Sequence, residues 1–323
     1  MTFGHGSDRL LARASRSAAW GGAVLALAAC GGGTETPGRQ VDAGAERTPA
    51  VVEVVDDAGR AVRLERPARR VVSLVPSVTE TVVALGAADR LVARTRYDDA
   101  PELAGLPSVG GGLDPSIESI VALEPDLVVA WNAREGRLAS PLVGAGIPVY
   151  LADIQDTTGI FTTIRRFGAL LGRGDAADSL AGALRDSLAA VAAGAGEGAR
   201  PAVFYWMAGD PPRTAGRSTF IGEAIDIAGG TNAFGDLRAR WPAVSLEAVV
   251  ARDPDVVVVP VGDGLPDAED LAATPGWREL TAVRTGRLVE IPADLFARPG
   301  PRLGAAARAL REGLEAVHPA EAR

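Results

Sequence analysis

A fifteen-residue pattern occurs twice in this chain, and it limits the possible folds more than any other feature. Residues 116–130 read SIESIVALEPDLVVA and residues 245–259 read SLEAVVARDPDVVVV, with the same residue at eight of the fifteen positions. Each copy has apolar residues at helical spacing, then Pro-Asp, then four apolar residues, which predicts a short helix leading into a buried strand. Such a strand is typical of a parallel sheet covered by helices on both faces. We therefore predict two α/β lobes with one copy in each.

A weaker repetition supports the same division. The segment ETVVALG at residues 80–86 is echoed by EAIDIAG at residues 223–229, and each follows a strand-like run. With 323 residues, of which 47% are hydrophobic, the chain can form two cores of ordinary size. We predict a three-layer α/β lobe over residues 51–157, a rigid helical connector over 158–198 and a second such lobe over 199–323. Both sheets should be rich in parallel strands, with a ligand cleft between the lobes.

The first thirty residues have the features of an export signal. Three arginines precede the apolar run AAWGGAVLALAA, which is too short to span a bilayer but suits the core of a signal peptide. The next residue completes Leu-Ala-Ala-Cys, which resembles the bacterial lipobox, so we predict a signal peptide over residues 1–29 and lipidation at Cys30. The alternative is a buried or unpaired thiol. Gly, Pro and polar residues over 30–50 indicate a flexible tether.

Local patterns place secondary structure within the lobes and the connector. The segment VVEVVDDAGRAVRLE, which starts at residue 51, alternates around Asp-Ala-Gly-Arg and predicts a hairpin. A strand over residues 70–75 precedes Ser77-Val-Thr-Glu80, a capping-box pattern that predicts a helix starting at Ser77. An alanine-rich amphipathic pattern over 175–193 predicts a helix long enough to cross stiffly between the lobes.

Charge and residue counts argue against several functions. The formal net charge is −8, whereas nucleic-acid binding demands a basic surface. The chain has no lysine, which excludes a Walker-type phosphate loop and Schiff-base chemistry. Its two histidines, His5 and His318, lie near the ends, so a histidine metal site or a catalytic triad is hard to build.

Catalysis is the main alternative to binding. Ser77 stands at a strand-to-helix turn, as a nucleophile often does. No histidine is placed to activate it, however, and the flanking glycines of a nucleophile elbow are absent. We therefore predict that the chain is not an enzyme.

Aromatic side chains gather where strands of the predicted sheets end. Ligands of open parallel sheets bind beyond the carboxyl ends of the strands. Two facing lobes with aromatic residues there would hold a flat, largely apolar ligand, and a few polar groups would orient it. The alternative is that each aromatic side chain packs over its own sheet. The candidate ligand-binding residues are Ser77, Tyr97, Trp131, Trp206, Trp241, Asp294, Phe296 and Arg298.

Each copy of the repeat also carries one glutamate, Glu118 or Glu247, near the start of its helix. A carboxylate at such a position gains roughly 0.3–1 kcal/mol from the helix dipole, which is one sufficient reason for its presence. The alternative is a docking role, because a partner with two-fold symmetry would present the same basic pocket twice and could bind one acid from each lobe.

Several of these segments together resemble one protein family. Similarity to the substrate-binding lipoproteins of ABC importers for cobalamin and ferric siderophores is carried by DDAGRAVRLERPARRVVSLVPSVTE, IVALEPDLVVAW, RWPAVSLE and the lipobox. The resemblance implies two α/β lobes joined by a rigid helix, a ligand held between them with little lobe closure, and a lipid anchor on the periplasmic or cell-surface side of a membrane. It also implies that Glu118 and Glu247 dock onto arginines of a dimeric permease, which works with an ATPase.

Within this family the chain is most similar to the cobalamin binders. The resemblance implies corrinoid contacts at Tyr97, Trp131, Trp206, Trp241, Asp294 and Phe296. The cobalamin pattern has an aromatic residue shortly before the first repeat, where this chain has Gly110-Gly111-Gly112, so a ferric siderophore or haem is the alternative ligand. Iron would arrive already chelated, and we expect neither direct metal coordination nor a resident cofactor. A lipid-anchored ligand sensor of the same fold would share every motif.

Overall fold

The computed structural model describes residues 51–132, 138–195, 200–207, 209–262 and 264–318. The predicted signal peptide, the lipidation site Cys30 and the tether lie outside these residues. The chain divides into two units, residues 1–46 and residues 47–323, and every described residue belongs to the second. Within the described part of this unit, no helix has the length and apolar character needed to cross a membrane. The predicted boundaries of the lobes inside this unit stay predictions.

A hairpin opens the described chain, as the sequence predicted. Its strands β1 (Val52–Val55) and β2 (Ala61–Leu64) are antiparallel. The turn is tied by Asp56, a buried carboxylate that accepts hydrogen bonds from the backbone and the guanidinium of Arg60. Asp56 also accepts from the backbone N–H of Leu151, so the hairpin is fixed to the first lobe.

The first lobe is built on a four-stranded parallel sheet. Its order is β4 (Leu91–Ala93), β3 (Val71–Ser73), β5 (Leu127–Trp131) and β6 (Val149–Ala152). One face packs against α1 (Pro76–Ala84) and α4 (Thr157–Leu170), and the other against α2 (Ile117–Ala122) and α3 (Ser140–Gly144). Two 3₁₀ turns, η1 (Ala88–Arg90) and η2 (Pro101–Leu103), flank β4.

The second lobe has a four-stranded parallel sheet of its own. Its order is β10 (Leu288–Pro292), β9 (Val256–Val261), β7 (Ala202–Tyr205) and β8 (Thr231–Asn232). On one face lie α6 (Phe220–Ile227) and α11 (Leu303–Val317). The other face meets α7 (Leu246–Arg252), α8 (Ala268–Ala273), η5 (Trp277–Glu279) and α9 (Thr281–Arg284), while the short α10 (Ala293–Phe296) follows β10.

The two sheets have the same strand order, which confirms the duplication predicted from the repeat. The order β4-β3-β5-β6 corresponds to β8-β7-β9-β10, and the two repeat copies form α2-β5 and α7-β9. The repeated Pro-Asp has one role in both. The carboxylate of Asp126 accepts from the backbone N–H of Arg70 at 2.9 Å, and that of Asp255 accepts from Ala202 at 2.7 Å. Each aspartate therefore ties the start of its strand to the neighbouring central strand.

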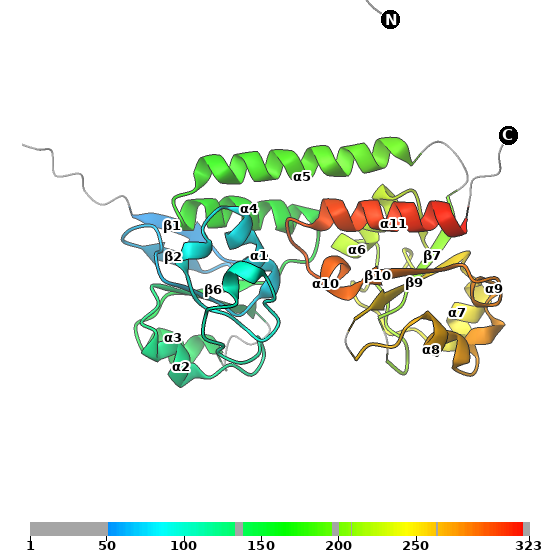
Figure 1. The fold of residues 1–323 in the computed structure, drawn as a ribbon, viewed down its shortest axis with the longest axis horizontal. Coiled ribbons are helices and arrows are strands. Elements are labelled where there is room, and N and C mark those ends of the chain that lie inside the picture. Colours follow the sequence, from blue (N-terminus) through cyan, green and yellow to red (C-terminus); the bar gives the residue numbers. More distant parts are fainter. Residues whose placement is uncertain (1–50, 133–137, 196–199, 208, 263, 319–323) are drawn as a thin grey trace, which may run out of the picture. The chain divides into compact units, whose positions relative to one another are not determined.

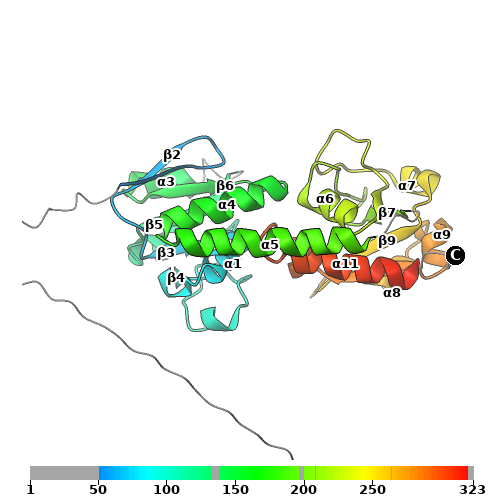
Figure 2. The ribbon, with the colours of Figure 1, turned by 90° about the horizontal axis from the view of Figure 1, so that it is seen from above.

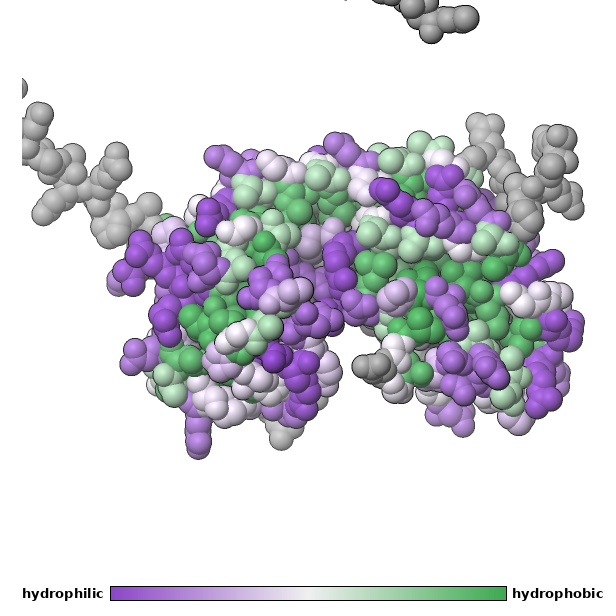
Figure 3. All heavy atoms as spheres, viewed as in Figure 1, coloured by the Kyte–Doolittle hydropathy of each residue, from purple (hydrophilic) through white to green (hydrophobic). Residues whose placement is uncertain are grey.

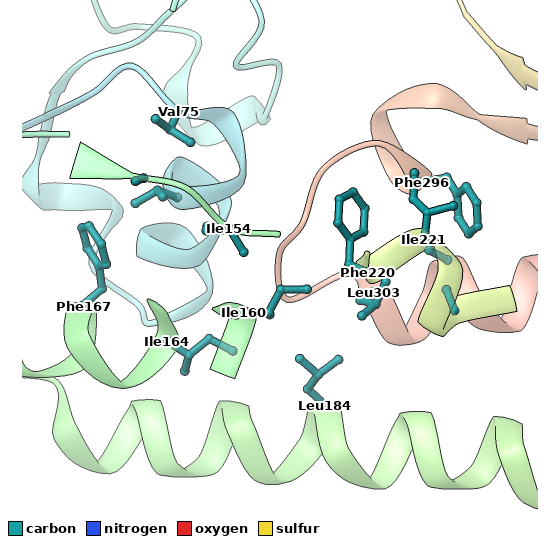
Figure 4. Close-up of a cluster of buried hydrophobic side chains, with 14 of the residues drawn as sticks. Val75, Ile154, Ile160, Ile164, Phe167, Leu184, Phe220, Ile221, Phe296 and Leu303 are labelled. Atoms are coloured by element: carbon teal, nitrogen blue, oxygen red, sulfur yellow. The ribbon is translucent and has the colours of Figure 1, made fainter. Parts of the chain in front are cut away.

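The predicted long helix is α5 (Gly174–Gly194), which runs past α4 at one end and past α11 and α6 at the other (Figures 1 and 2). Its buried Leu184 belongs to one continuous apolar cluster that includes side chains of both lobes. Figure 4 shows Leu184 beneath Ile160 and Ile164 on one side and Phe220 and Leu303 on the other. The predicted architecture of two α/β lobes joined by a rigid helix is confirmed, and the lobes share a core.

The start of α1 differs from the sequence prediction. The helix begins at Pro76, and its N-cap Val75 provides no side-chain cap, so the predicted capping box at Ser77 is wrong. The reason is that proline lacks an N–H and has a fixed φ, which suits the first helical position. Ser77 therefore lies inside the first turn rather than at the cap.

The buried side chain of Tyr150 should make the fold less stable at high pH. Burial, and next the charge of Asp57, raises the pKa of Tyr150 to about 12, although Arg166 donates a hydrogen bond to the hydroxyl at 2.9 Å. The raised pKa means that the folded state favours the neutral phenol of Tyr150. This group therefore contributes its full stabilisation of the fold below the unfolded pKa near 10, and the contribution is lost as the pH rises toward 12.

We expect the free energy of unfolding to fall on the order of 2 kcal/mol more between pH 10 and 12 in the wild type than in Tyr150→Phe. Urea unfolding at a series of pH values measures this difference. Tyr97→Phe is the control, because that side chain is 54% exposed and the substitution should leave the fall unchanged. An equal fall in wild type and Tyr150→Phe would contradict the expectation.

Candidate functional site

The candidate site lies beyond the carboxyl ends of the two parallel sheets. Trp131 ends β5, Trp206 follows β7, and Tyr97 lies four residues after β4. A space-filling view shows a notch between the two lobes on the side away from α5 (Figure 3). Segments that follow strands of one sheet also bond to the other lobe, through Arg298 and Gln155, so residues from both sheets meet at this junction.

Trp206 lies at the end of the second sheet beside a small cavity. Its side chain is 8% exposed and packs on Trp277, with ring centroids 5.5 Å apart. The buried indole Nε1 has no hydrogen-bond partner in the described part of the chain. The cavity beside it has a volume of about 160 Å³ and is lined by apolar side chains, among them Met207, Pro260 and Leu265. A cavity with this lining can take an apolar group.

Trp131 is half-buried under the glycine segment that departs from the cobalamin pattern. A Cβ on Gly112 would lie 2.3 Å from the carbonyl oxygen of Leu74 and 3.1 Å from the indole Nε1 of Trp131. No side chain fits at such a distance from a backbone oxygen. The glycine is therefore required by the close approach of this loop to the end of β3.

Tyr97 is the most exposed of the candidate aromatics, at 54%. The guanidinium of Arg96 lies over its ring, 5.6 Å from the centroid. Its backbone carbonyl accepts a hydrogen bond of 2.9 Å from Arg298, which belongs to the second lobe. The ring is thus free to contact a ligand, while its backbone is held across the lobe junction.

Arg298 belongs to a group of charges that joins the lobes. It pairs with Glu80 of α1 at 2.8 Å and with Asp99 at 3.5 Å. Arg302 also pairs with Glu80, at 2.7 Å, and with Asp294 at 3.2 Å. Burial, the largest single cause, lowers the pKa of Arg302, but the hydrogen bonds and charges of Glu80 and Asp294 together raise it, so the net shift of this pKa is upward and the guanidinium stays charged. A cavity of about 520 Å³ adjoins these residues.

Trp241 is also held from the opposite lobe. Its indole Nε1 donates to the side-chain oxygen of Gln155, three residues beyond β6, at 2.9 Å. Its ring is half-buried and meets Phe220 edge-on, with centroids 5.8 Å apart. Neither Gln155 nor Glu80 was identified from the sequence, because their partners lie 86 and 218 residues away along the chain.

Besides Trp206, two of the candidate residues are buried in this structure. Phe296 is 1% exposed and packs on Tyr205 with centroids 5.4 Å apart, and Ser77 is also 1% exposed. The hydroxyl of Ser77 has no hydrogen-bond partner among the described residues, and the backbone carbonyl and Cβ of Ser77 lie close to Gly300 of the second lobe. Their predicted contacts with a ligand stay predictions.

Glu118 and Glu247 occupy equivalent exposed positions in the first turns of α2 and α7. Each helix is capped by the serine two residues earlier, Ser116 or Ser245. Hydrogen bonds from its own backbone N–H and from Ser245 lower the pKa of Glu247, so its carboxylate is charged at neutral pH. Both helices lie on the side of the lobes away from α5 (Figure 1).

Metal-ligating residues do not gather in the described part of the chain. No group of three or more His, Cys, Asp or Glu there could hold a metal ion. The arrangement of aromatic rings near the ends of the sheets, with a charged junction between the lobes, is suited to holding an organic ligand by stacking and polar contacts.

Comparison with known proteins gives the family. The sequence profile of the periplasmic binding proteins matches residues 71–295. The chain belongs to this family. The match confirms the resemblance found in the sequence, and it makes both lobes part of one periplasmic binding protein.

Two relatives extend the similarity beyond the profile. An uncharacterized ABC transporter substrate-binding lipoprotein of Bacillus subtilis, YvrC, is 30% identical over 94% of this chain and 98% of its own length. A cobalamin-binding protein of Halobacterium salinarum is 34% identical over 77% of this chain and 70% of its own length. Both are described as binding proteins.

Solved structures of periplasmic binding proteins with different ligands share this fold. The vitamin B12-binding protein BtuF of Vibrio cholerae superposes with a TM-score of 0.66 at 27% identity, covering 78% of this chain and 99% of that one. The haem-binding protein RhuT of Roseiflexus sp. RS-1 gives 0.69 at 27%, covering 77% and 99%. A protein of a Fe³⁺-hydroxamate transport system from Saccharomonospora viridis gives 0.68 at 27%, covering 81% and 98%.

Proposed function

We propose that this periplasmic binding protein is the lipid-anchored substrate-binding component of an ABC importer, and that its ligand is a corrinoid such as cobalamin. The observation that carries the proposal is the placement of Tyr97, Trp131, Trp206 and Trp241 around the ends of the two sheets. Rings at these positions can stack on a flat macrocycle and cover its apolar edges. The relatives described as cobalamin-binding or vitamin B12-binding support the same ligand.

The proposed partners follow from the family and from the symmetry of the fold. The ligand-loaded protein delivers its cargo to a permease dimer that is driven by an ATPase. Glu118 and Glu247 are related by the duplication of the lobes, so they can meet equivalent basic sites on the two permease subunits. Lipid on Cys30 keeps the binding protein on the outer side of the membrane that holds the importer. Nucleic acid is not a partner.

Haem or a ferric siderophore is the second candidate ligand. The specific observation that favours it is Gly112, where the close approach to Leu74 leaves no room for the aromatic side chain of the cobalamin pattern. The haem-binding and hydroxamate-transport structures have the same fold at the same level of identity as the B12-binding one. In either case the metal arrives inside its chelate.

Titration of the chain from residue 30, with Cys30→Ser to prevent lipidation, tests the ligand. Calorimetry and tryptophan quenching are measured with cyanocobalamin, haemin and a ferric hydroxamate in parallel. We expect cyanocobalamin to bind with micromolar or tighter affinity and to quench the fluorescence, because indoles surround the proposed site. Binding of haemin or the hydroxamate without any response to cyanocobalamin would overturn the corrinoid assignment, and binding of none of the three would overturn the ligand class.

A further inference from the structure

Gln155 connects the two lobes at the tryptophan that the proposed function places against the ligand. Its side-chain oxygen accepts from the indole of Trp241 at 2.9 Å, and its backbone oxygen accepts from the N–H of Phe220 at 2.9 Å. Phe220 is the ring that Trp241 packs against. Gln155 of the first lobe thus fixes both the indole of Trp241 and the start of α6.

The chemistry at this position requires an amide. The other end of the Gln155 side chain donates to the carboxylate of Asp153, whose own N–H donates to Asp57 of the hairpin turn at 2.8 Å. An indole N–H can only donate, and a carboxylate can only accept. A side chain that satisfies both neighbours needs one acceptor end and one donor end. Glutamate would place a second carboxylate against Asp153, and leucine would satisfy neither neighbour.

A second bond between the lobes has a similar arrangement. There Tyr97 of the first lobe is held through its carbonyl by Arg298 of the second lobe, and Arg298 is in turn paired with Glu80. Each lobe therefore supplies the polar group that fixes an aromatic residue of the other. The distance and angle between Tyr97 and Trp241 depend on bonds across the junction rather than on either lobe alone.

We infer that Gln155 is a positioning residue for ligand binding: from the opposite lobe, it holds the Trp241 indole in the orientation that the ligand meets. The inference rests on the proposed function, because it takes Trp241 as a ligand contact. Without this hydrogen bond the half-buried indole can rotate, and the ligand must order it again on binding. We expect Gln155→Leu, which removes the acceptor, to weaken cyanocobalamin binding about tenfold.

The first measurement needs no ligand. In ¹⁵N-labelled chain from residue 30, with Cys30→Ser, the indole N–H signal of Trp241 is assigned by its absence in Trp241→Phe. We expect slow exchange of this proton with water in the wild type and fast exchange in Gln155→Leu, while the buried indole N–H of Trp206 is the internal reference and stays unchanged. Equal exchange at Trp241 in both proteins would overturn the inference.

The second measurement is a double-mutant cycle on ligand affinity. Phenylalanine keeps the apolar ring but has no N–H, so Gln155→Leu should cause no further loss of affinity in the Trp241→Phe background. A tenfold loss in that background as well would mean that Gln155 acts through the general structure of the junction, and would overturn its positioning role. If the wild type binds none of the three chelates, the proposed function fails, and the exchange measurement still decides whether Gln155 holds the indole.

Discussion

Reversing the charge of both repeat glutamates, Glu118→Arg with Glu247→Arg, should reduce stimulation of the importer's ATPase by more than tenfold while ligand affinity stays unchanged. If each carboxylate docks onto arginines, each reversal replaces an attraction with a repulsion in a closed interface. Truncating one partner of such a pair costs about 2–5 kcal/mol, so two reversals exceed a tenfold effect by a wide margin. Because both side chains are exposed in the first turns of short helices and neither is a candidate ligand contact, the ligand site should be intact.

The measurement uses the importer reconstituted in lipid nanodiscs, with ligand-loaded binding protein as the stimulant. Glu102→Arg with Glu269→Arg is the matched control, because these glutamates are also exposed, also lie one in each lobe and change the net charge equally. If the variant with both repeat glutamates reversed stimulates the ATPase normally, the docking role of Glu118 and Glu247 is wrong. A collapse of ligand affinity would show that these residues belong to the ligand site instead.

Gly112→Ala should destabilise the fold by about 3 kcal/mol, although it adds a single methyl group. The new Cβ would lie 2.3 Å from the carbonyl oxygen of Leu74, a backbone atom that cannot rotate away. Leu74 is itself fixed, since its N–H donates to Val129 of the central strand β5 at 2.9 Å. The loop must therefore move, and its movement uncovers Trp131. We expect a lower urea midpoint together with weaker ligand binding.

Gly144→Ala is the control for that substitution. This glycine ends α3, and a Cβ there would meet no atom within 4 Å beyond its chain neighbours and the backbone of its own helix. Alanine in place of glycine at such a helical position stabilises by roughly 0.5–1 kcal/mol. If Gly112→Ala is as stable as Gly144→Ala, the loop can adapt, and the glycine would then not be what excludes an aromatic side chain from this part of the site.

The two-lobed architecture could be predicted from the sequence because residues within the repeat determine where its helix ends and where its strand begins. In both copies the residue before Pro-Asp, Glu124 or Asp253, adopts a positive φ of 46° or 38°, which ends the helix before the proline. The aspartate after the proline then ties the next strand to the sheet. The spacing of apolar residues, the residue that ends the helix and the aspartate that anchors the strand all lie within one short segment. They can therefore be predicted from that segment alone. The same reasoning failed at Ser77, where Pro76 occupies the first helical position and moves the helix start.

The site was predictable only in part. Aromatic residues after strands could be identified one at a time, because strand ends are visible in the sequence. The groups that hold them could not, since Gln155 and Arg298 act on residues 86 and 201 positions away. One signal was used only to support the division into two lobes, and its glutamates were not considered. The weak echo of residues 80–86 at 223–229 aligns Glu80 with Glu223, and both contact the opposite lobe, Glu80 through Arg298 and Glu223 through the backbone N–H of Thr157 at 2.8 Å.

The apolar cluster around Leu184 has a consequence for cargo release. Because helices α4, α5 and α11 join the lobes through one core, opening them means exposing apolar surface, whose cost rises with every square ångström uncovered. Spreading the lobes is therefore costly, and we expect a ligand held between them to dissociate slowly. If the protein delivers its ligand to an importer as proposed, we expect docking to supply the free energy that spreading the lobes costs, so that release takes place on the importer.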